Sequence, residues 1–104
     1  MIRRKRTDRN HIIYKISIKS STYIGVTYVE KGNKNKSLRR RWLKHIQRAM
    51  TEDRDWMLCN AIRKHGPDAF VVEIVEVVRG KASAHSRERE LIRLHKPKLN
   101  SDKR

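Results

Sequence analysis

The sequence contains a single cysteine, Cys59, among its 104 residues. An intrachain disulfide is therefore impossible, and the chain is typical of a reducing compartment such as the cytoplasm. Long apolar runs are also missing, since no segment approaches the ~20 apolar residues of a membrane span. The apolar segment behind the basic start, residues 12–18, is interrupted by Lys15 and Ser17, and no small-residue cleavage site follows it. We therefore expect a soluble, intracellular protein that makes no contact with a membrane.

Acidic residues are scarce, and the first half of the chain has almost none. The sequence contains 27 Lys and Arg residues against 11 Asp and Glu, which gives a net charge of +16. Residues 1–48 carry 15 of the basic residues and only two acids, Asp8 and Glu30. A field of one sign repels itself and costs stability, so it indicates a polyanionic partner. Nucleic acid is the partner that we expect, and an anionic membrane surface is the less favoured alternative.

The length is that of one domain, and a chain of this size buries a thin hydrophobic core. Residues 1–10 are polar and basic, and we expect them to form a flexible arm. Residues 11–104 form the single folded domain. Residues 12–18 and 23–28 are rich in β-branched and aromatic side chains, and a short polar turn between them indicates a hairpin. The alternation in the first segment places Ile12, Tyr14, Ile16 and Ile18 on one buried face.

The rest of the chain predicts three helices and one more strand. Ser37 is placed to cap a helix that runs to about residue 49, after a polar loop at 29–36. Thr51 is placed to cap a second helix that ends at His65, before Gly66 and Pro67. Residues 70–78 read as a buried strand. Ser83 is placed to cap a third helix, which Pro97 ends. The expected fold is α/β, of the α+β kind: a small, mainly antiparallel three-stranded sheet with three flanking helices in the order β-β-α-α-β-α.

Glu88 is the first residue whose position indicates chemistry. The third predicted helix has one broad apolar face that contains Ala84, Leu91, Ile92 and His95, and Glu88 falls on the same face. A carboxylate on the apolar side of a helix is costly unless a metal or a cation accompanies it. The alternative is an amphipathic edge position in which Glu88 pairs with Arg87 or Arg89.

Arg41 and His45 are four residues apart in the first predicted helix, so they share one face. Arginine suits bidentate contact with phosphate, and histidine transfers protons near neutral pH. The alternative is a solvated basic face that touches phosphate without catalysis. Tyr14, Tyr23, Trp42 and Trp56 are by themselves typical of core packing. The other histidines are scattered and cysteine occurs once, so a zinc site is not expected.

Five sequence elements in order, from His11 to Asn100, resemble the GIY-YIG nuclease family. The second signature triplet is intact as Tyr23-Ile24-Gly25, whereas the first is Ile12-Ile13-Tyr14, with isoleucine in place of the family's glycine. The basic helix motif of the family is matched by Leu38-x-x-Arg41-x-x-x-His45, and residues 58–76 are similar to phage-type homing and stand-alone members. The C-terminal block is matched by Glu88-x-x-Leu91-Ile92-x-x-x-x-Pro97-x-Leu99-Asn100.

The resemblance implies a metal-dependent endonuclease that hydrolyses double-stranded DNA and leaves 5′-phosphate and 3′-hydroxyl ends. It implies that Glu88 binds one Mg²⁺ or Mn²⁺ ion per active site and that Arg41 holds the scissile phosphate. Tyr14 is expected to position or deprotonate the attacking water with the help of His45. The positive charge of Arg41 and His45 is expected to lower the pKa of that phenol. Tyr23 is expected to orient water or phosphate, and Asn100 to brace the pocket or bond a phosphate oxygen.

Contacts with DNA are expected along the basic arm, the loop 31–36 and the first helix. The residues expected to bind DNA are Arg3, Arg4, Lys5, Arg6, Arg39, Arg40, Lys44 and Arg48. Two alternatives stay open: a non-catalytic basic protein that binds nucleic acid, and an inactive member of the family. The sequence also leaves open whether the chain forms a homodimer, which sequence it cuts, and whether it nicks DNA or cuts both strands.

Overall fold

The computed structural model describes residues 9–52 and 57–100, and it confirms the predicted α+β fold and element order. A three-stranded antiparallel sheet in the order β2-β1-β3 is flanked by three helices. None of the helices in these two ranges is long and apolar enough to cross a membrane. The elements are β1 (Asn10–Ile18), β2 (Ser21–Tyr28), α1 (Lys34–Thr51), α2 (Met57–His65), the 3₁₀ turn η2 (Pro67–Ala69), β3 (Val71–Arg79) and α3 (Lys81–His95).

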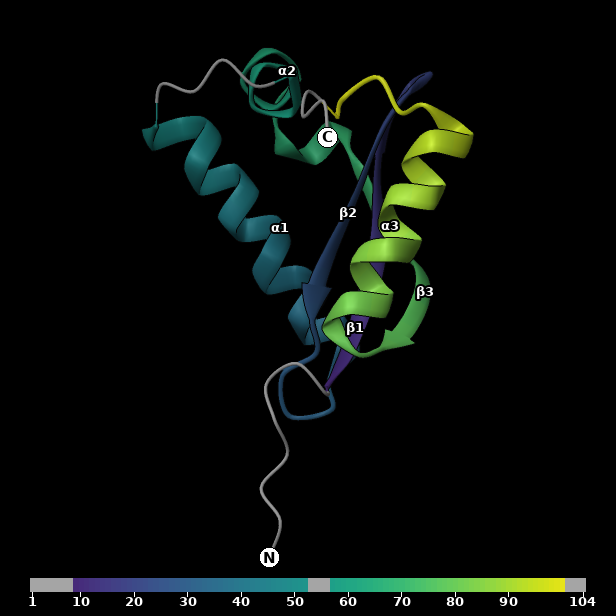
Figure 1. Cartoon of the computed structure of the whole chain (residues 1–104). Coiled ribbons are helices and arrows are strands. Elements are labelled where there is room, and N and C mark those ends of the chain that lie inside the picture. The colour runs from purple at the N-terminus through teal and green to yellow at the C-terminus, as the bar shows by residue number, and fades with distance from the viewer. Residues whose placement is uncertain (1–8, 53–56, 101–104) are drawn as a thin grey trace, which may run out of the picture.

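The central strand β1 is buried on both faces, whereas its sequence predicts only one buried face. On the predicted face, Tyr14, Ile16 and Ile18 pack in a cluster that includes residues of α1 and α2. On the other face, Ile13 is fully buried against Ile24 of β2 and Leu91 of α3. The sheet therefore lies between two helical layers, and β2 runs between α1 and α3 (Figure 1).

The strand β1 begins at Asn10, two residues before the predicted start. Asn10 pairs with Arg79 of β3, and the Gly80 amide donates a 3.0 Å hydrogen bond to the Arg9 carbonyl. The prediction that the flexible arm extends to residue 10 is therefore wrong at that residue, because Asn10 belongs to the sheet. Four residues that are predicted to bind DNA lie outside the described residues: Arg3, Arg4, Lys5 and Arg6.

The helix α1 begins four residues earlier than predicted, and Ser37 is not its cap. The side-chain oxygen of Asn33 accepts a hydrogen bond of 3.0 Å from the Lys36 amide, which makes Asn33 the N-cap. Ser37 is buried inside the helix, where its hydroxyl accepts from the Glu30 amide and donates to the Asn33 carbonyl. Ser37 lies in the first turn of α1, and from there its hydroxyl holds the loop that precedes the helix.

The predicted caps of the other two helices are also wrong, although both helices exist. Thr51 is the last residue of α1, and α2 begins at Met57 and ends at His65 as expected. The helix α3 begins at Lys81, directly after Gly80, whose φ of 92° favours glycine. Ser83 therefore lies inside α3, which ends at His95, before Pro97.

The strand β3 is an edge strand rather than the predicted buried one. In the described sheet it pairs with β1 alone, and its residues alternate between exposed and half-buried. Val71, Val75 and Val77 are 60%, 47% and 44% exposed. An apolar run predicts a strand but carries no information on the number of neighbouring strands, so the position at the edge was not predictable from it.

Candidate active site

A cavity of about 460 Å³ opens over β2, between α1 and α3. Five of the six residues assigned to catalysis line it, and they come from β2, both helices and the segment after α3. These residues are Tyr23, Arg41, His45, Glu88 and Asn100. The sixth, Tyr14, is buried and contacts Arg41 and His45. The fold thus brings together residues that are up to 86 positions apart in the sequence (Tyr14 to Asn100).

The wall formed by α1 contains a hydrogen-bonded group centred on the Tyr14 hydroxyl. His45 Nε2 lies 2.8 Å from the Tyr14 oxygen, and Arg41 Nε donates to the same oxygen at 3.3 Å. Because Arg41 only donates, the phenol proton is left for His45 Nε2 when that nitrogen is unprotonated. The ring of Tyr23 packs edge-on against the His45 ring, with centroids 5.3 Å apart. Arg41 and His45 therefore share a face, as the spacing predicts, and that face points into the fold.

Burial determines the protonation of this group. It lowers the pKa of His45 to about 3, with smaller contributions from the charges of Arg41 and Arg48. Burial raises the pKa of Tyr14 and of Tyr23, and the charge of Arg41 opposes both shifts. His45 is therefore neutral at pH 7, contrary to the expectation that it supplies positive charge to Tyr14.

Arg41 is the cation of the group. Burial lowers the pKa of Arg41, but the interactions with Tyr14, then with Tyr23 and Glu88, outweigh that effect and raise it overall. The guanidinium therefore stays charged in a half-buried position beside the two phenols. A phosphate that enters the cavity therefore meets the positive charge of Arg41 there, together with those of the other arginines that line it.

The rings of Tyr14 and Tyr23 leave no space for a side chain at position 25, which explains the glycine in the Tyr23-Ile24-Gly25 triplet. Gly25 pairs with Tyr14 across the hairpin, and a Cβ atom at position 25 would lie 2.5 Å from the Tyr14 hydroxyl oxygen. The same atom would lie 2.8 Å from Tyr23 Cε1. Any side chain at position 25 would displace these rings, so the glycine permits the site without contributing a functional group. Sequence reasoning assigned it no role.

The wall formed by α3 presents Glu88, whose side chain is 16% exposed. It lies close enough to Tyr14, Tyr23 and Arg41 to affect their pKa values. Of the predicted apolar face of this helix, Ala84 and Leu91 are buried, whereas His95 is exposed.

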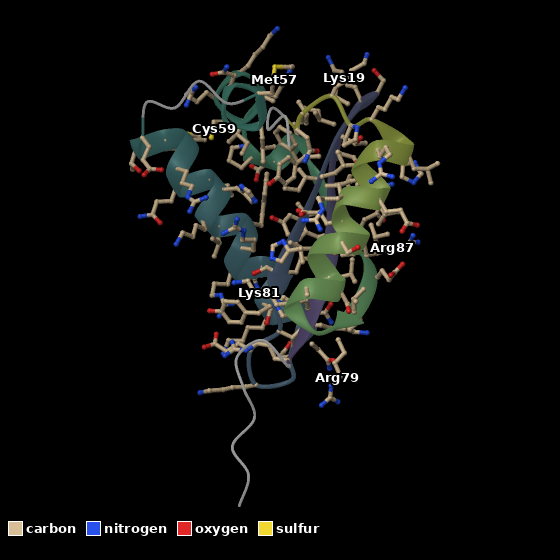
Figure 2. The ribbon with its side chains drawn as sticks, viewed as in Figure 1. Lys19, Met57, Cys59, Arg79, Lys81 and Arg87 are labelled. Atoms are coloured by element: carbon tan, nitrogen blue, oxygen red, sulfur yellow. The ribbon has the colours of Figure 1, made fainter. Side chains whose placement is uncertain are left out.

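The alternative for Glu88 is a pair with Arg87 or Arg89. Arg89 lines the same cavity as Glu88, whereas Arg87 has other partners. That residue points away from α1 on the outer side of α3 (Figure 2), where it pairs with Glu76 of β3 and with Glu90. Glu88 lines the cavity, and Arg87 does not.

His85 is the residue of this site that sequence reasoning missed. Its Nδ1 atom lies 3.7 Å from Glu88 Oε1, one helical turn away, and both residues line the cavity. His11 of β1 is near enough for His85 to lower its pKa, although burial lowers it more. The two histidines were interpreted as scattered, but the i, i+3 spacing of His85 and Glu88 was a signal available in the sequence.

Glu88 fits a metal ion that takes most of its ligands from water and substrate. Within residues 9–52 and 57–100, no group of three or more His, Cys, Asp or Glu side chains is placed to hold an ion. Mg²⁺ is commonly bound through one or two carboxylates and retains several waters, so a single carboxylate at an open cavity suits it. A closed structural zinc site would need more protein ligands.

Asn100 is tied to the backbone of β2. Its Oδ1 accepts from the Ile24 amide at 2.9 Å, and its Nδ2 donates to the Ile24 carbonyl at 2.8 Å. The neighbouring Leu99 amide donates to the Thr22 carbonyl at 2.9 Å. Of the two expected roles, these contacts correspond to bracing the pocket.

The basic residues around the cavity differ in how firmly they are held. Arg9 and Arg40 lie over the Tyr28 ring, 4.7 and 4.6 Å from its centroid, and Arg40 also pairs with Glu30. Arg48 lines the cavity, whereas Arg39 and Lys44 are exposed on α1. A second hollow, bordered by Arg9, Tyr28 and Lys81, meets the first at Arg41, Val26 and His85. The cavity therefore continues into a basic groove at the end of β2.

Comparison of the chain with protein-family models, characterised proteins and solved structures finds no match. The interpretation of the site therefore depends on its own residues and geometry.

Proposed function

We propose that this protein is a metal-dependent endonuclease that hydrolyses phosphodiester bonds of double-stranded DNA, with the chemistry of the GIY-YIG nucleases that its sequence resembles. The observation that carries the proposal is the position of Glu88 across one cavity from the buried group of Tyr14, Arg41 and His45. A carboxylate, a fixed guanidinium and a proton-transfer pair are the components that phosphodiester hydrolysis needs. The expected products carry 5′-phosphate and 3′-hydroxyl ends.

Arg41 binds the scissile phosphate in this proposal. Its guanidinium is half-buried, charged and hydrogen-bonded to Tyr14, so its position is set before substrate arrives. A preorganised cation stabilises the charge that builds on the phosphate oxygens without the cost of reorienting at the moment of reaction. Tyr23, whose ring packs against His45 at the cavity surface, orients the attacking water or a phosphate oxygen.

Tyr14 and His45 move the proton. Because burial keeps Tyr14 protonated, the phenol takes a proton from the attacking water only as it passes its own to His45 Nε2, 2.8 Å away. The charge of Arg41 contributes to the low pKa of His45. A bound phosphate offsets that charge and thereby makes His45 a better acceptor. Substrate binding thus raises the pKa of His45 and makes it a stronger base.

Glu88 holds the divalent cation, Mg²⁺ or Mn²⁺. When bound, the ion supplies Lewis-acid stabilisation of the negative charge on the phosphate and on the leaving 3′ oxygen. The carboxylate lies on the wall opposite Arg41, so a cation held by Glu88 and the Arg41 guanidinium would contact a phosphate from two sides.

The basic groove and the exposed face of α1 bind the DNA backbone. Arg9 and Arg40, held on the Tyr28 ring, and the exposed Arg39 and Lys44 offer cations to successive phosphates. Phosphate contacts fix the position of a duplex and carry little sequence information, so we expect weak sequence discrimination. The proposal places the enzyme in the cytoplasm, with its DNA substrate.

The test is cleavage of supercoiled plasmid with Mg²⁺, with EDTA, and by a Glu88→Ala variant. We expect nicked or linear DNA from the native protein with Mg²⁺ and intact plasmid in the other two reactions. Glu90→Ala is the matched control, because Glu90 lies on the same helix but is exposed and paired with Arg87. The control should cut like the native chain.

The competing function is that of a basic protein that binds nucleic acid without cutting it. The charge of +16 is compatible with it. A native protein that retards the plasmid but leaves plasmid, branched DNA and single strands intact, in Mg²⁺ and in Mn²⁺, would replace the nuclease proposal with this one.

A further inference from the structure

His85 and Glu88 form a pair of potential metal ligands on one face of α3. The Nδ1 and Oε1 atoms are 3.7 Å apart, and both side chains line the cavity that faces Arg41. The helix fixes their spacing, since residues three apart project from adjacent turns on the same side. The pair faces the cavity where DNA phosphate is proposed to enter, and Glu88 influences the pKa of the phenols of the opposite wall.

The separation of 3.7 Å is slightly larger than that of two atoms that bind one ion. Nitrogen and oxygen ligands lie about 2.0–2.2 Å from a first-row divalent metal. At octahedral or tetrahedral angles, two such ligands are therefore roughly 3.0–3.5 Å apart. A small rotation of the His85 side chain, which is 37% exposed and lies at the cavity, closes the remaining few tenths of an ångström.

The imidazole changes the kind of ion that the site prefers. Carboxylate and water suit Mg²⁺ and Mn²⁺ alike, whereas imidazole nitrogen suits the transition metals and is rarely a ligand of Mg²⁺. A site with Glu88 alone discriminates poorly between these ions. A site with Glu88 and His85 gains affinity for Mn²⁺ without gaining it for Mg²⁺.

We propose that His85 is a second protein ligand of the cation bound at Glu88, and that it biases the site toward Mn²⁺ over Mg²⁺. The inference rests on the proposed function, because it takes Glu88 as the metal ligand. It adds a ligand that does not belong to the motifs on which the nuclease resemblance depends. The preference among metals would then depend on His85, whereas the ability to bind any metal would depend on Glu88.

The experiment is Mn²⁺ binding to the full chain, followed by electron paramagnetic resonance. The free-ion signal gives the affinity, and electron spin-echo modulation detects nitrogen bound to Mn²⁺. We expect ¹⁴N modulation from the native chain, and its replacement by the ¹⁵N pattern when histidine is labelled with ¹⁵N. His85→Ala and His85→Gln should lose the modulation and bind Mn²⁺ about 10- to 100-fold more weakly. Their affinity for Mg²⁺, measured by competition, should change less than about threefold, because imidazole is a poor ligand for that ion.

The matched control is His95→Ala, an exposed histidine on the last turn of the same helix. It should keep the native affinity and the modulation. If the native chain binds Mn²⁺ through Glu88, with loss in Glu88→Gln, but shows no histidine nitrogen and binds equally well in His85→Ala, the inference is wrong and the nuclease proposal stands. If Mn²⁺ does not bind, or if Glu88→Gln binds it like the native chain, both proposals lose their metal site.

Discussion

The two walls of the cavity are built in opposite ways. On the α1 wall, Tyr14 and His45 are 1% and 6% exposed and bond to each other. On the α3 wall, the side chains of Glu88 and His85 are 16% and 37% exposed. One wall is part of the core, and the other is a helix face open to the cavity.

The difference corresponds to the two tasks that we propose for the walls. Groups that stabilise a transition state act best when they are already in place, and burial with mutual hydrogen bonds provides that on the α1 wall. Groups that bind an exchangeable ion must exchange water for metal, and the α3 wall leaves them accessible to do so. The same burial that fixes the α1 wall shifts the pKa values of Tyr14, Tyr23 and His45.

The largest effect is expected from removal of the cation of the α1 wall. Arg41→Ala should lower the cleavage rate about 10²- to 10³-fold, the usual loss for one preorganised charge-stabilising donor. The DNA affinity should fall far less, because many other cations contact the backbone. Single-turnover cleavage and a gel-shift titration measure the two quantities. Arg39→Ala, on the exposed face of the same helix, should change neither by more than a few fold.

Equal losses of rate and affinity in Arg41→Ala would show that Arg41 is only a binding residue. The two walls would then differ in burial but not in chemical role.

A smaller effect is expected when a residue of the α1 wall is shifted rather than removed. Gly25→Ala places a Cβ atom 2.5 Å from the Tyr14 hydroxyl oxygen, so the Tyr14 ring or the backbone at position 25 must shift, and the contact between Tyr14 and His45 is disturbed. Such overpacking costs about 1–3 kcal/mol of unfolding free energy. We expect that loss in chemical denaturation, together with slower cleavage at unchanged Mn²⁺ affinity. Weaker Mn²⁺ binding in this variant would show that the two walls are not independent.

The smallest effect concerns the proton balance of His45. Its pKa is about 3 in the folded chain against an ordinary value of 6.5, so between these values the unfolded chain binds the extra proton. Stability therefore rises with pH across this window and is lost as the pH falls. Between pH 7 and pH 5 the native chain should lose about 2 kcal/mol more unfolding free energy than His45→Gln. Denaturation curves at both pH values measure this, and identical pH dependence in the two proteins would show that His45 titrates as it does in water.

Local patterns were sufficient to predict the elements of the fold but not all of their boundaries. Alternation and apolar runs placed three strands and three helices in the correct order, because period and composition are local properties. The cap at Asn33 and the edge position of β3 were missed. The edge position of β3 depends on tertiary pairing, because β3 pairs with β1 alone in the described sheet. The cap does not, since the bond from the Lys36 amide to Asn33 spans only three residues, and Asn33 was a local signal that the choice of Ser37 overlooked.

Motif spacing was sufficient to select the candidate site residues. It was not sufficient to predict their burial or their protonation. The spacing of Arg41 and His45 predicts a shared face, but only the fold shows that this face is buried and that His45 is neutral. Sequence spacing also contained the pair of His85 and Glu88, yet it became meaningful only once α3 was seen to border the cavity. The steric role of Gly25 depends on its partner across the hairpin, and no local pattern records that contact.

The bonds of Asn100 to Ile24 join residues 76 positions apart. At synthesis rates of about 5–20 residues per second, roughly 4–15 s separate the two residues on the ribosome. During that interval the outer edge of β2 lacks the hydrogen bonds that the tail supplies, although the hairpin and α1 can already form. The cavity is therefore completed later than the hairpin, and a nascent chain does not possess it until the segment that contains Asn100 has been made.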